Sequence, residues 1–430
     1  MISHRNAVAY NFNKKIGGKE MKLIGEYFSE AHPDRLADAI VSKIIKEVLD
    51  KTEIAICNLG CSIIKNQVFV FGNIIHDHDE DVMSEELIKY LVKDVYYENG
   101  YWKASKNNLS NQYFRVRPVV KGEEDDFDET IIEVIVNVEV IKDKAKVAKY
   151  KHYVFEQAII TGYAINSKET NYLPVASYIA SSLVAKYEYL FSSAQYILSP
   201  LVHEKSKYIS PCFKLKVELD YDGENYRYNE VVVQFVSSDK TPKERVLEKI
   251  EVNFSSLFDF KSDELQLLNP INKDKFQYVF INEGESNIGG PYTIPGSSSH
   301  LSRLDFYDSE FIPVNENGKG KDCNNINVCG AIRARQLAIN LVRKYGYYSV
   351  FVRVVYLPNT VTPYLIEAYH IDKEGAINKI ENNKLPKKYW FSKTAIFEDL
   401  PFISRDRPTS IRNINYSKLI EKEDSDEINR

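Results

Sequence analysis

The stretch Ser29-Glu30-Ala31-His32-Pro33-Asp34-Arg35-Leu36-Ala37-Asp38 carries a turn with histidine, aspartate and arginine straight into a helix. Pro33 suits the first turn of a helix, and Asp34 suits a cap or an acidic place in that turn. From Leu36 onward, apolar residues recur in two rows at helical spacing. The rows are Leu36, Ile40, Ile44 and Val48, and beside them Ala37, Val41, Ile45 and Leu49. A helix N-terminus presents free N–H groups and a positive dipole end, so this turn suits phosphate; a capped helix with a salt bridge is the simpler interpretation.

Residues 26–38 resemble the N-terminal signature of the S-adenosylmethionine synthetases (methionine adenosyltransferases), which usually read E-S-V-S-E-G-H-P-D-K-I-A-D here. Further segments resemble other motifs of that family, in the family's order. They are residues 155–164 followed by 171–174, residues 210–214 ahead of a strand, residues 280–291, and residues 317–322. Because five motifs occur in order between residues 21 and 375, the chain is identified as a divergent member of this family.

The resemblance implies an α/β (α+β) fold, similar to that of the S-adenosylmethionine synthetases. Three similar sheet-plus-helix domains would be arranged with pseudo-threefold symmetry. The predicted parts are an N-terminal extension at 1–20, an N-terminal domain at 21–130 with a lid-like loop at 103–130, a central domain at 131–287, a C-terminal domain at 288–412 and a disordered tail at 413–430.

Local patterns in the sequence predict individual helices and strands. Alternating apolar residues predict neighbouring strands at 54–59 and 67–74, and a further strand at 131–141. A helix is predicted at 330–345, where alanine and aliphatic residues recur. Residues 103–130 show no helix or strand except a run that begins at Tyr113, and no element is expected after Lys387.

Composition narrows the class of protein. The chain has 430 residues, of which 44% are hydrophobic, and this suffices for one large or two to three modest cores. The net charge of −5 argues against non-specific binding to nucleic acid. No apolar run reaches the length of a membrane span, and the five cysteines lack the spacing of a zinc or disulfide framework. We therefore expect a cytoplasmic, reduced protein with no nucleic-acid or membrane partner.

The family joins the sulfur of methionine to C5′ of ATP by direct displacement, and cleaves the departing triphosphate before releasing it. A thioether is a weak nucleophile, so catalysis depends on alignment and on stabilising the charge of the leaving group. The resemblance thus implies ATP and methionine as ligands, with Mg²⁺ as cofactor. It also implies a homodimer with active sites between subunits, or a heteromer with a true synthetase.

Site residues are assigned by position in the family motifs. His32 matches the histidine beside the reacting carbon and phosphate, and Lys214 and Lys321 match two triphosphate lysines, so these three are the catalytic candidates. Asp34 matches a magnesium ligand. The candidates for binding substrate or nucleotide are Glu26, Glu156, Gln157, Asp322, Gly289 and Gly290.

The sequence departs from the family at several charged positions. Three triphosphate cations are replaced by His300, Leu301 and Asn325. A metal-binding acid is replaced by Asn327, and the glutamates for a monovalent cation and for methionine are replaced by Asn58 and Asn73, which weakens the case for K⁺. Each lost charged contact costs about 2–4 kcal/mol of transition-state stabilisation. Three hypotheses stay open: an active but divergent adenosyltransferase, a related nucleotide-dependent enzyme with altered chemistry, and an impaired paralogue that pairs with a true synthetase or senses a ligand.

Overall fold

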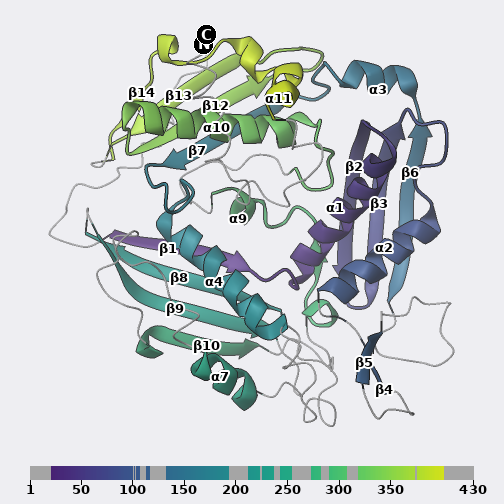
Figure 1. Cartoon of the computed structure of the whole chain (residues 1–430), viewed down its shortest axis with the longest axis vertical. Coiled ribbons are helices and arrows are strands. Elements are labelled where there is room, and N and C mark those ends of the chain that lie inside the picture. The colour runs from purple at the N-terminus through teal and green to yellow at the C-terminus, as the bar shows by residue number, and fades with distance from the viewer. Residues whose placement is uncertain are drawn as a thin grey trace, which may run out of the picture.

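A computed structural model describes most of the chain. The described residues are 21–99, 101, 103–106, 113–116, 132–192, 212–222, 225–236, 243–253, 273–281, 290–307, 318–372 and 375–400. The predicted extension at 1–20, most of the loop at 103–130, Gly289 and the tail at 413–430 lie outside these ranges. In the described ranges the chain forms three four-stranded sheets, which surround the short helix α9 (Ser302–Phe306) (Figure 1).

The N-terminal sheet contains the strand pair predicted at 54–59 and 67–74. In order across the sheet, its strands are β11 (Gly296–Ser297), β2 (Ala55–Ile64), β3 (Gln67–His76) and β6 (Glu133–Lys142). β11 and β2 are antiparallel, as are β2 and β3, whereas β6 runs parallel to β3. Its helices are α1 (Pro33–Lys51) and α2 (Glu85–Glu98), which pack on one face and on each other. Separately, β4 (Lys103–Lys106), which the sequence did not predict, pairs antiparallel with β5 (Tyr113–Val116).

The central sheet repeats this arrangement. Its strands in order are β1 (Met21–Phe28), β8 (Phe213–Tyr221), β9 (Tyr226–Val236) and β10 (Phe276–Ile281). As in the N-terminal sheet, the last strand is parallel to its neighbour. The helices beside it are α4 (Val175–Ser192) and α7 (Lys243–Val252), and the single turn η1 (Lys273–Lys275) leads into β10.

The C-terminal sheet differs in having only antiparallel pairs. Its strands in order are β14 (Ile377–Lys379), β13 (Leu365–Ile371), β12 (Ser349–Tyr356) and β7 (Ala158–Ile165). The predicted helix at 330–345 is α10 (Ile326–Tyr345), which packs on β7 and β12. The remaining elements are α3 (Lys144–Tyr150), η2 (Gly290–Tyr292), η3 (Asn382–Lys384), η4 (Lys388–Phe391) and α11 (Lys393–Asp399). The expectation that no element follows Lys387 is wrong, because α11 packs on α10 there.

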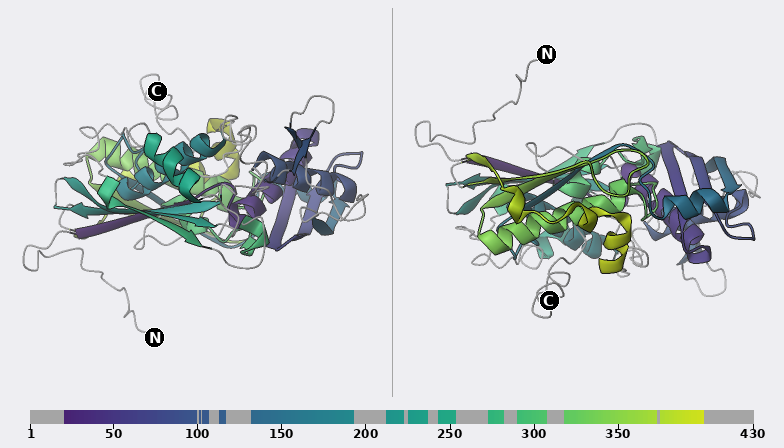
Figure 2. Two further views of the ribbon diagram at one scale, coloured as in Figure 1. Left: turned by 90° about the horizontal axis from the view of Figure 1, so that it is seen from below. Right: turned by 90° about the horizontal axis from the view of Figure 1, so that it is seen from above.

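The three units exchange elements in a ring, whose connections cross near the centre of Figure 1. Figure 2 shows the molecule edge-on, with the N-terminal sheet at the right of both views. The chain leaves β1 of the central sheet and enters α1 on the N-terminal sheet, and it leaves β7 of the C-terminal sheet and enters α4 on the central sheet. It then leaves β11 of the N-terminal sheet and reaches α10 on the C-terminal sheet. The sheets therefore do not coincide with the contiguous segments 21–130, 131–287 and 288–412.

A glycine marks the same contact in all three units and supports the pseudo-threefold relation. Gly25 in β1, Gly162 in β7 and Gly296 in β11 each lie against the backbone of the helix that covers their sheet. A Cβ atom at any of them would come closer than 3.0 Å to backbone atoms, respectively of Ala176, Ala334 and Pro33. Only glycine permits this approach of strand and helix.

Each sheet buries its own apolar cluster against its helices. Both rows predicted for α1 face the core of the N-terminal unit, where Leu36, Ile40 and Ile44 are fully buried. Burying each such side chain contributes about 1.5–3 kcal/mol, so α1 is held firmly and its first turn is a fixed platform. Among the described helices, none combines the length and apolar character that crossing a membrane requires.

Candidate active site

His32 fixes the turn ahead of α1. It is the N-cap residue, and its Nδ1 accepts a hydrogen bond from the N–H of Asp34 at 3.3 Å. Burial first, and then the positive charges of Arg35 and Lys214, lower the pKa of His32 to about 3. The imidazole is therefore neutral at pH 7, and its contact of 3.7 Å with a carboxylate oxygen of Asp34 is not an ion pair. Because Nδ1 accepts, the proton is assigned to Nε2, which is left as a donor.

Lys214 lies beside this turn because β8 pairs with β1. Lys214 is opposite Phe28 in the register of the two strands, and its Nζ lies 5.8 Å from the centre of the Phe28 ring. The His32 ring packs edge-on against the same ring, with 4.6 Å between centroids. In the part of the chain that the structure describes, no carboxylate pairs with Lys214. Its charge is thus available to an anion at the N-terminus of α1.

Two aspartates of α1 hold residues 297–300 against the turn. Asp34 Oδ1 accepts the N–H of Ser297 at 2.8 Å, and Asp34 Oδ2 lies 3.0 Å from Nδ1 of His300. One turn later, Asp38 Oδ1 accepts the N–H of Ser299 at 2.8 Å. Both oxygens of Asp34, the predicted magnesium ligand, are therefore engaged by groups of the protein.

The described residues do not fit a magnesium site held by this chain. Mg²⁺ prefers an octahedral set of oxygens with carboxylates among them, and the turn offers only the engaged carboxylate of Asp34. At the second predicted metal position, Asn327 donates from Nδ2 to Glu156 at 3.0 Å and supplies no carboxylate. No group of three or more His, Cys, Asp and Glu side chains suited to a metal occurs among the described residues. Asn58 likewise offers no charge to K⁺, so no step below is assigned to a metal.

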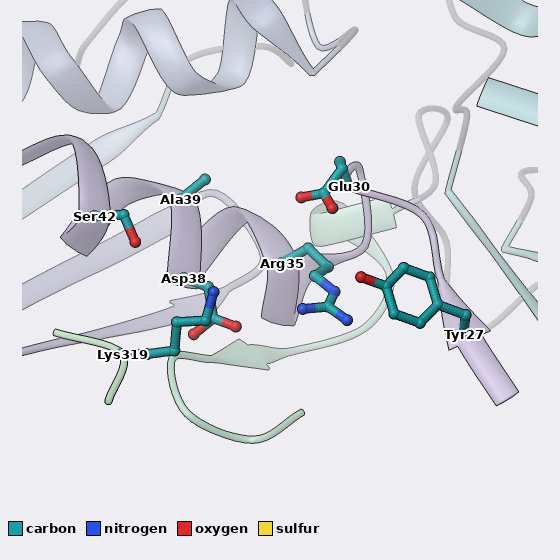
Figure 3. Close-up of a pocket in the computed structure, with 7 residues that line it drawn as sticks. All are labelled: Tyr27, Glu30, Arg35, Asp38, Ala39, Ser42 and Lys319. Atoms are coloured by element: carbon teal, nitrogen blue, oxygen red, sulfur yellow. The ribbon is translucent and has the colours of Figure 1, made fainter. Parts of the chain in front are cut away.

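A buried cluster of charged side chains connects α1 to α9. The guanidinium of Arg35 donates to Asp305 in α9 and lies 4.8 Å from the ring centre of Tyr27. Lys319 Nζ is 3.8 Å from Asp305 Oδ2, and burial raises the pKa of Asp38 to about 7. Figure 3 shows Lys319 beside Asp38, and Arg35 directed toward Tyr27. The cavity between them, about 20 Å³, has room for one water, so these cations serve the fold.

A second group of predicted residues gathers at the start of α10. Lys321 Nζ lies 3.3 Å from both carboxylate oxygens of Glu156, and these two side chains line a cavity of about 200 Å³. Asp322 is fully buried beside it and accepts hydrogen bonds from the N–H groups of Cys57 and Asn324 and from the hydroxyl of Tyr150. Burial raises the pKa of Asp322 to about 6. Asp322 therefore binds groups of the protein.

The structure thus brings Lys214 together with His32 and Asp34, and places Lys321 and Glu156 in another group. Glu26 pairs with Arg303 at 3.2 Å on the edge of the first group.

The two remaining predicted binding residues that the structure describes differ in setting. Gln157 is exposed and does not line the cavity. Gly290 has a φ of +56°, and a Cβ there would overlap the hydroxyl of Tyr101, which donates to the carbonyl of Ala31 at 2.7 Å. The close approach that requires glycine at 290 is thus to a tyrosine of the same chain.

Two lysines of the second group were missed in the sequence. Lys146 on α3 and Lys393 on α11 both line the cavity. The N-cap Ser392, whose Oγ accepts the N–H of Ala395, was the available signal for α11. Nothing distinguishes Lys146 from its neighbouring lysines without the fold.

Comparisons with known proteins show which family this chain resembles. The family model described as S-adenosylmethionine synthetase, N-terminal domain, matches residues 21–117. The S-adenosylmethionine synthase of Flavobacterium johnsoniae is 23% identical over 404 residues, covering 91% of this chain and 86% of that protein. That of Mesoplasma florum is 24% identical over 394 residues, covering 91% and 93%. This chain is therefore similar to the S-adenosylmethionine synthetases along most of its length, and residues 21–117 match their N-terminal domain.

A solved structure shows the same fold for this chain. The structure described as an unusual S-adenosylmethionine synthetase from Campylobacter jejuni superposes with a TM-score of 0.62 at 18% identity, covering 93% of this chain and 92% of that one. The three-unit α/β architecture is therefore that of the S-adenosylmethionine synthetases.

Two of the residues that stand where the family has cations have structural roles in this chain. Leu301, which occupies a position where the family has a lysine, precedes α9 and is buried in the core of the central unit. Asn325, which occupies another position where the family has a lysine, is the N-cap of α10. Its side chain accepts a hydrogen bond from the N–H of Asn327 at 2.9 Å. Among possible replacements for these charges, Arg303 is paired with Glu26.

Proposed function

We propose that this protein binds ATP and transfers its adenosyl group to the sulfur of methionine or of a close thioether relative. In that reaction the sulfur attacks C5′, the bond from C5′ to the triphosphate oxygen breaks, and the triphosphate leaves with the electron pair. The sulfur becomes a sulfonium, and no proton or redox partner is required. The similarity to the S-adenosylmethionine synthetases supports this class of reaction.

The observation that carries the proposal is the positive potential at the turn ahead of α1. After burial, the charges of Arg35 and Lys214 lower the pKa of His32, so both charges are felt at the imidazole. The same potential would favour a phosphate, and the N-terminus of α1 adds to it. Arg35 is committed to Asp305, which leaves Lys214 as the cation that could contact a ligand.

The proposed roles follow from the positive charge of Lys214 and the neutral state of His32. Lys214 would stabilise the negative charge that the triphosphate gains as the bond to C5′ breaks. His32 would donate from Nε2 to a phosphate oxygen as a neutral group, because its pKa is far below neutrality. Its position at the N-cap of a packed helix would keep this donor aligned without reorganisation.

Cleavage of the triphosphate should be weaker than adenosyl transfer. Cleavage needs dense positive charge, and Leu301 and Asn325 are neutral where the resemblance places lysines. We therefore expect slow turnover with the triphosphate left intact. The same losses favour a second candidate, a nucleotide-binding paralogue that acts by pairing with an active synthetase.

A homodimer is part of the proposal. The two groups of site residues have different neighbours within one chain, so a second copy could bring His32 of one subunit to Lys321 of the other. The face of the N-terminal sheet opposite α1 carries exposed apolar side chains, among them Ile64, Phe71 and Ile135. Such a face suits burial against a partner.

The test uses the purified full chain with ATP, methionine and Mg²⁺, following S-adenosylmethionine, triphosphate and orthophosphate separately. We expect S-adenosylmethionine to form together with intact triphosphate, and Lys214→Ala to slow its formation. ATP binding without product, together with a stable complex with an active synthetase, would support the second candidate. Failure to bind ATP would contradict both.

A further inference from the structure

The cavity of about 200 Å³ at the start of α10 is small and separate from the turn ahead of α1. Its walls come from β2, β3, α3, the residues that precede β7, and the first residues of α10 and α11. Pockets for drug-sized ligands measure about 300–1,000 Å³, so this one suits a smaller molecule than a nucleotide. Ile56, Ile75 and Phe155 provide apolar wall for a hydrocarbon or thioether chain.

The charges that line this cavity are mainly positive. The lining includes three lysines, Lys146, Lys321 and Lys393, and one acidic residue, Glu156. Lys321 Nζ lies 3.3 Å from both oxygens of that carboxylate, so this pair is neutral together. The surplus charge of the lining therefore belongs to Lys146 and Lys393.

These two lysines can attract an anion through their charge. Lys393 is 1% exposed, and its Nζ donates to the carbonyls of Tyr150 at 2.7 Å and Tyr153 at 3.2 Å. The same ammonium lies 3.5 Å from the centre of the Tyr150 ring, so Lys393 offers a ligand its charge rather than a free donor. Within the described ranges neither Lys146 nor Lys393 forms an ion pair with a carboxylate. Asp322 attracts Lys393 from a distance, but its own oxygens accept bonds from backbone and tyrosine.

The side of the cavity formed by β2 and β3 offers amides and no acid. Asn58 and Asn73 lie directly opposite each other in the register of these strands, and both line the cavity. The resemblance places glutamates at these two positions, one of them for methionine. An ammonium group of a ligand would find only Glu156 here, already held by Lys321 and by Asn327.

We propose that this cavity receives the acceptor of the adenosyl group as a small thioether acid that has no ammonium group. Its carboxylate would contact Lys146 within the positive field of Lys393, and its thioether chain would lie along the apolar wall. The inference rests on the proposed function and on its homodimer, in which the cavity of one subunit would lie beside the turn of the other. The bond changes are the same: sulfur bonds to C5′ and the triphosphate leaves with the electron pair. The product is a sulfonium carboxylate in place of an amino acid.

Calorimetry with the full chain and a non-hydrolysable ATP analogue tests the inference. The probes are methionine, 4-(methylthio)butanoate, which lacks only the ammonium group, and methioninol, which lacks the carboxylate. We expect 4-(methylthio)butanoate to bind about tenfold more tightly than methionine, the scale of one charge-assisted contact, and methioninol not to bind. Equal or tighter binding of methionine would overturn the inference.

Variants show whether this cavity is responsible. Lys146→Ala should weaken binding of 4-(methylthio)butanoate about five- to tenfold. The matched control Lys144→Ala changes a lysine of the same helix that pairs with Asp79 at 2.9 Å outside the cavity, and it should leave binding unchanged. The double variant Asn58→Glu with Asn73→Glu should shift the preference toward methionine. Unchanged binding in Lys146→Ala would overturn the inference.

Two further measurements separate this inference from the proposed function. Binding of the ATP analogue alone tests the proposed function; if it fails, the same acid titrations without nucleotide still decide what the cavity takes. If nucleotide binds and the cavity prefers methionine, only the inference fails. Tripolyphosphate that binds through Lys146 while neither acid binds would assign the cavity to phosphates and also overturn it.

Discussion

Replacing Gly162 by alanine should disrupt the contact on which the C-terminal unit depends. The added Cβ would come closer than 3.0 Å to backbone atoms of Ala334 and Arg335 in α10, whereas ordinary contacts begin at 3.4 Å. These atoms belong to the buried middle of a helix of 20 residues, so relief requires moving α10 away from β7 by at least several tenths of an ångström. Overpacking of this kind costs about 1–3 kcal/mol, and a clash with fixed backbone belongs at the upper end.

Gly60→Ala is the matched control, because its Cβ would also come closer than 3.0 Å to another atom. There the neighbour is the side chain of Phe71, which is 46% exposed and free to rotate outward. We expect a loss of stability of less than about 1 kcal/mol for Gly60→Ala and about 3 kcal/mol for Gly162→Ala. Urea midpoints read by circular dichroism measure both. Equal midpoints for the two variants would refute the argument that fixed helix backbone sets the cost.

Three further predictions concern the turn and the helix starts. Lys214→Ala should weaken ATP binding by about 1.5–3 kcal/mol in calorimetry. The control Lys216→Ala should weaken it far less, because the Nζ of Lys216 pairs with Glu230 at 3.0 Å. Equal losses would place the phosphates elsewhere. The pKa of His32 is about 3 in the folded state and ordinarily 6.5, so between these pH values the folded state binds fewer protons than the unfolded state. The free energy of unfolding should therefore fall as the pH falls from 6.5, by up to about 1.4 kcal/mol per pH unit. His32→Asn, which keeps a cap, should show a shallower slope by urea unfolding, and equal slopes would contradict the shift. Asn325→Ala should cost about 0.5–2 kcal/mol as a lost cap, whereas Asn325→Asp should cost almost nothing in thermal unfolding.

Local patterns predicted the elements well where one face of a helix or strand is buried. Both apolar rows of α1 and the antiparallel pair of β2 and β3 are confirmed, because spacing along the chain determines them. The ring exchange was not predicted, since β11 has only two residues and pairs across more than 230 positions of sequence. The hydrogen bonds from Ser297 and His300 to Asp34 were missed for the same reason, because these residues are also far from Asp34 in the sequence. Without the fold, the Asp34 carboxylate was interpreted as a metal ligand.

Five of the six polar residues of the opening stretch, all except Glu30, can be explained by the fold alone. Ser29 Oγ accepts the N–H of Phe213 at 3.0 Å, His32 caps α1, Asp34 and Asp38 hold residues 297–300, and Arg35 pairs with α9.

The signature that identifies the family is therefore not evidence of catalysis by itself, since a scaffold without activity would need the same residues. Lys214 differs, because the described part of the chain gives its ammonium only the ring of Phe28. An anionic ligand would supply the partner that the described residues do not. The binding behaviour of Lys214→Ala thus separates a working nucleotide site from a retained fold more sharply than any change within the signature.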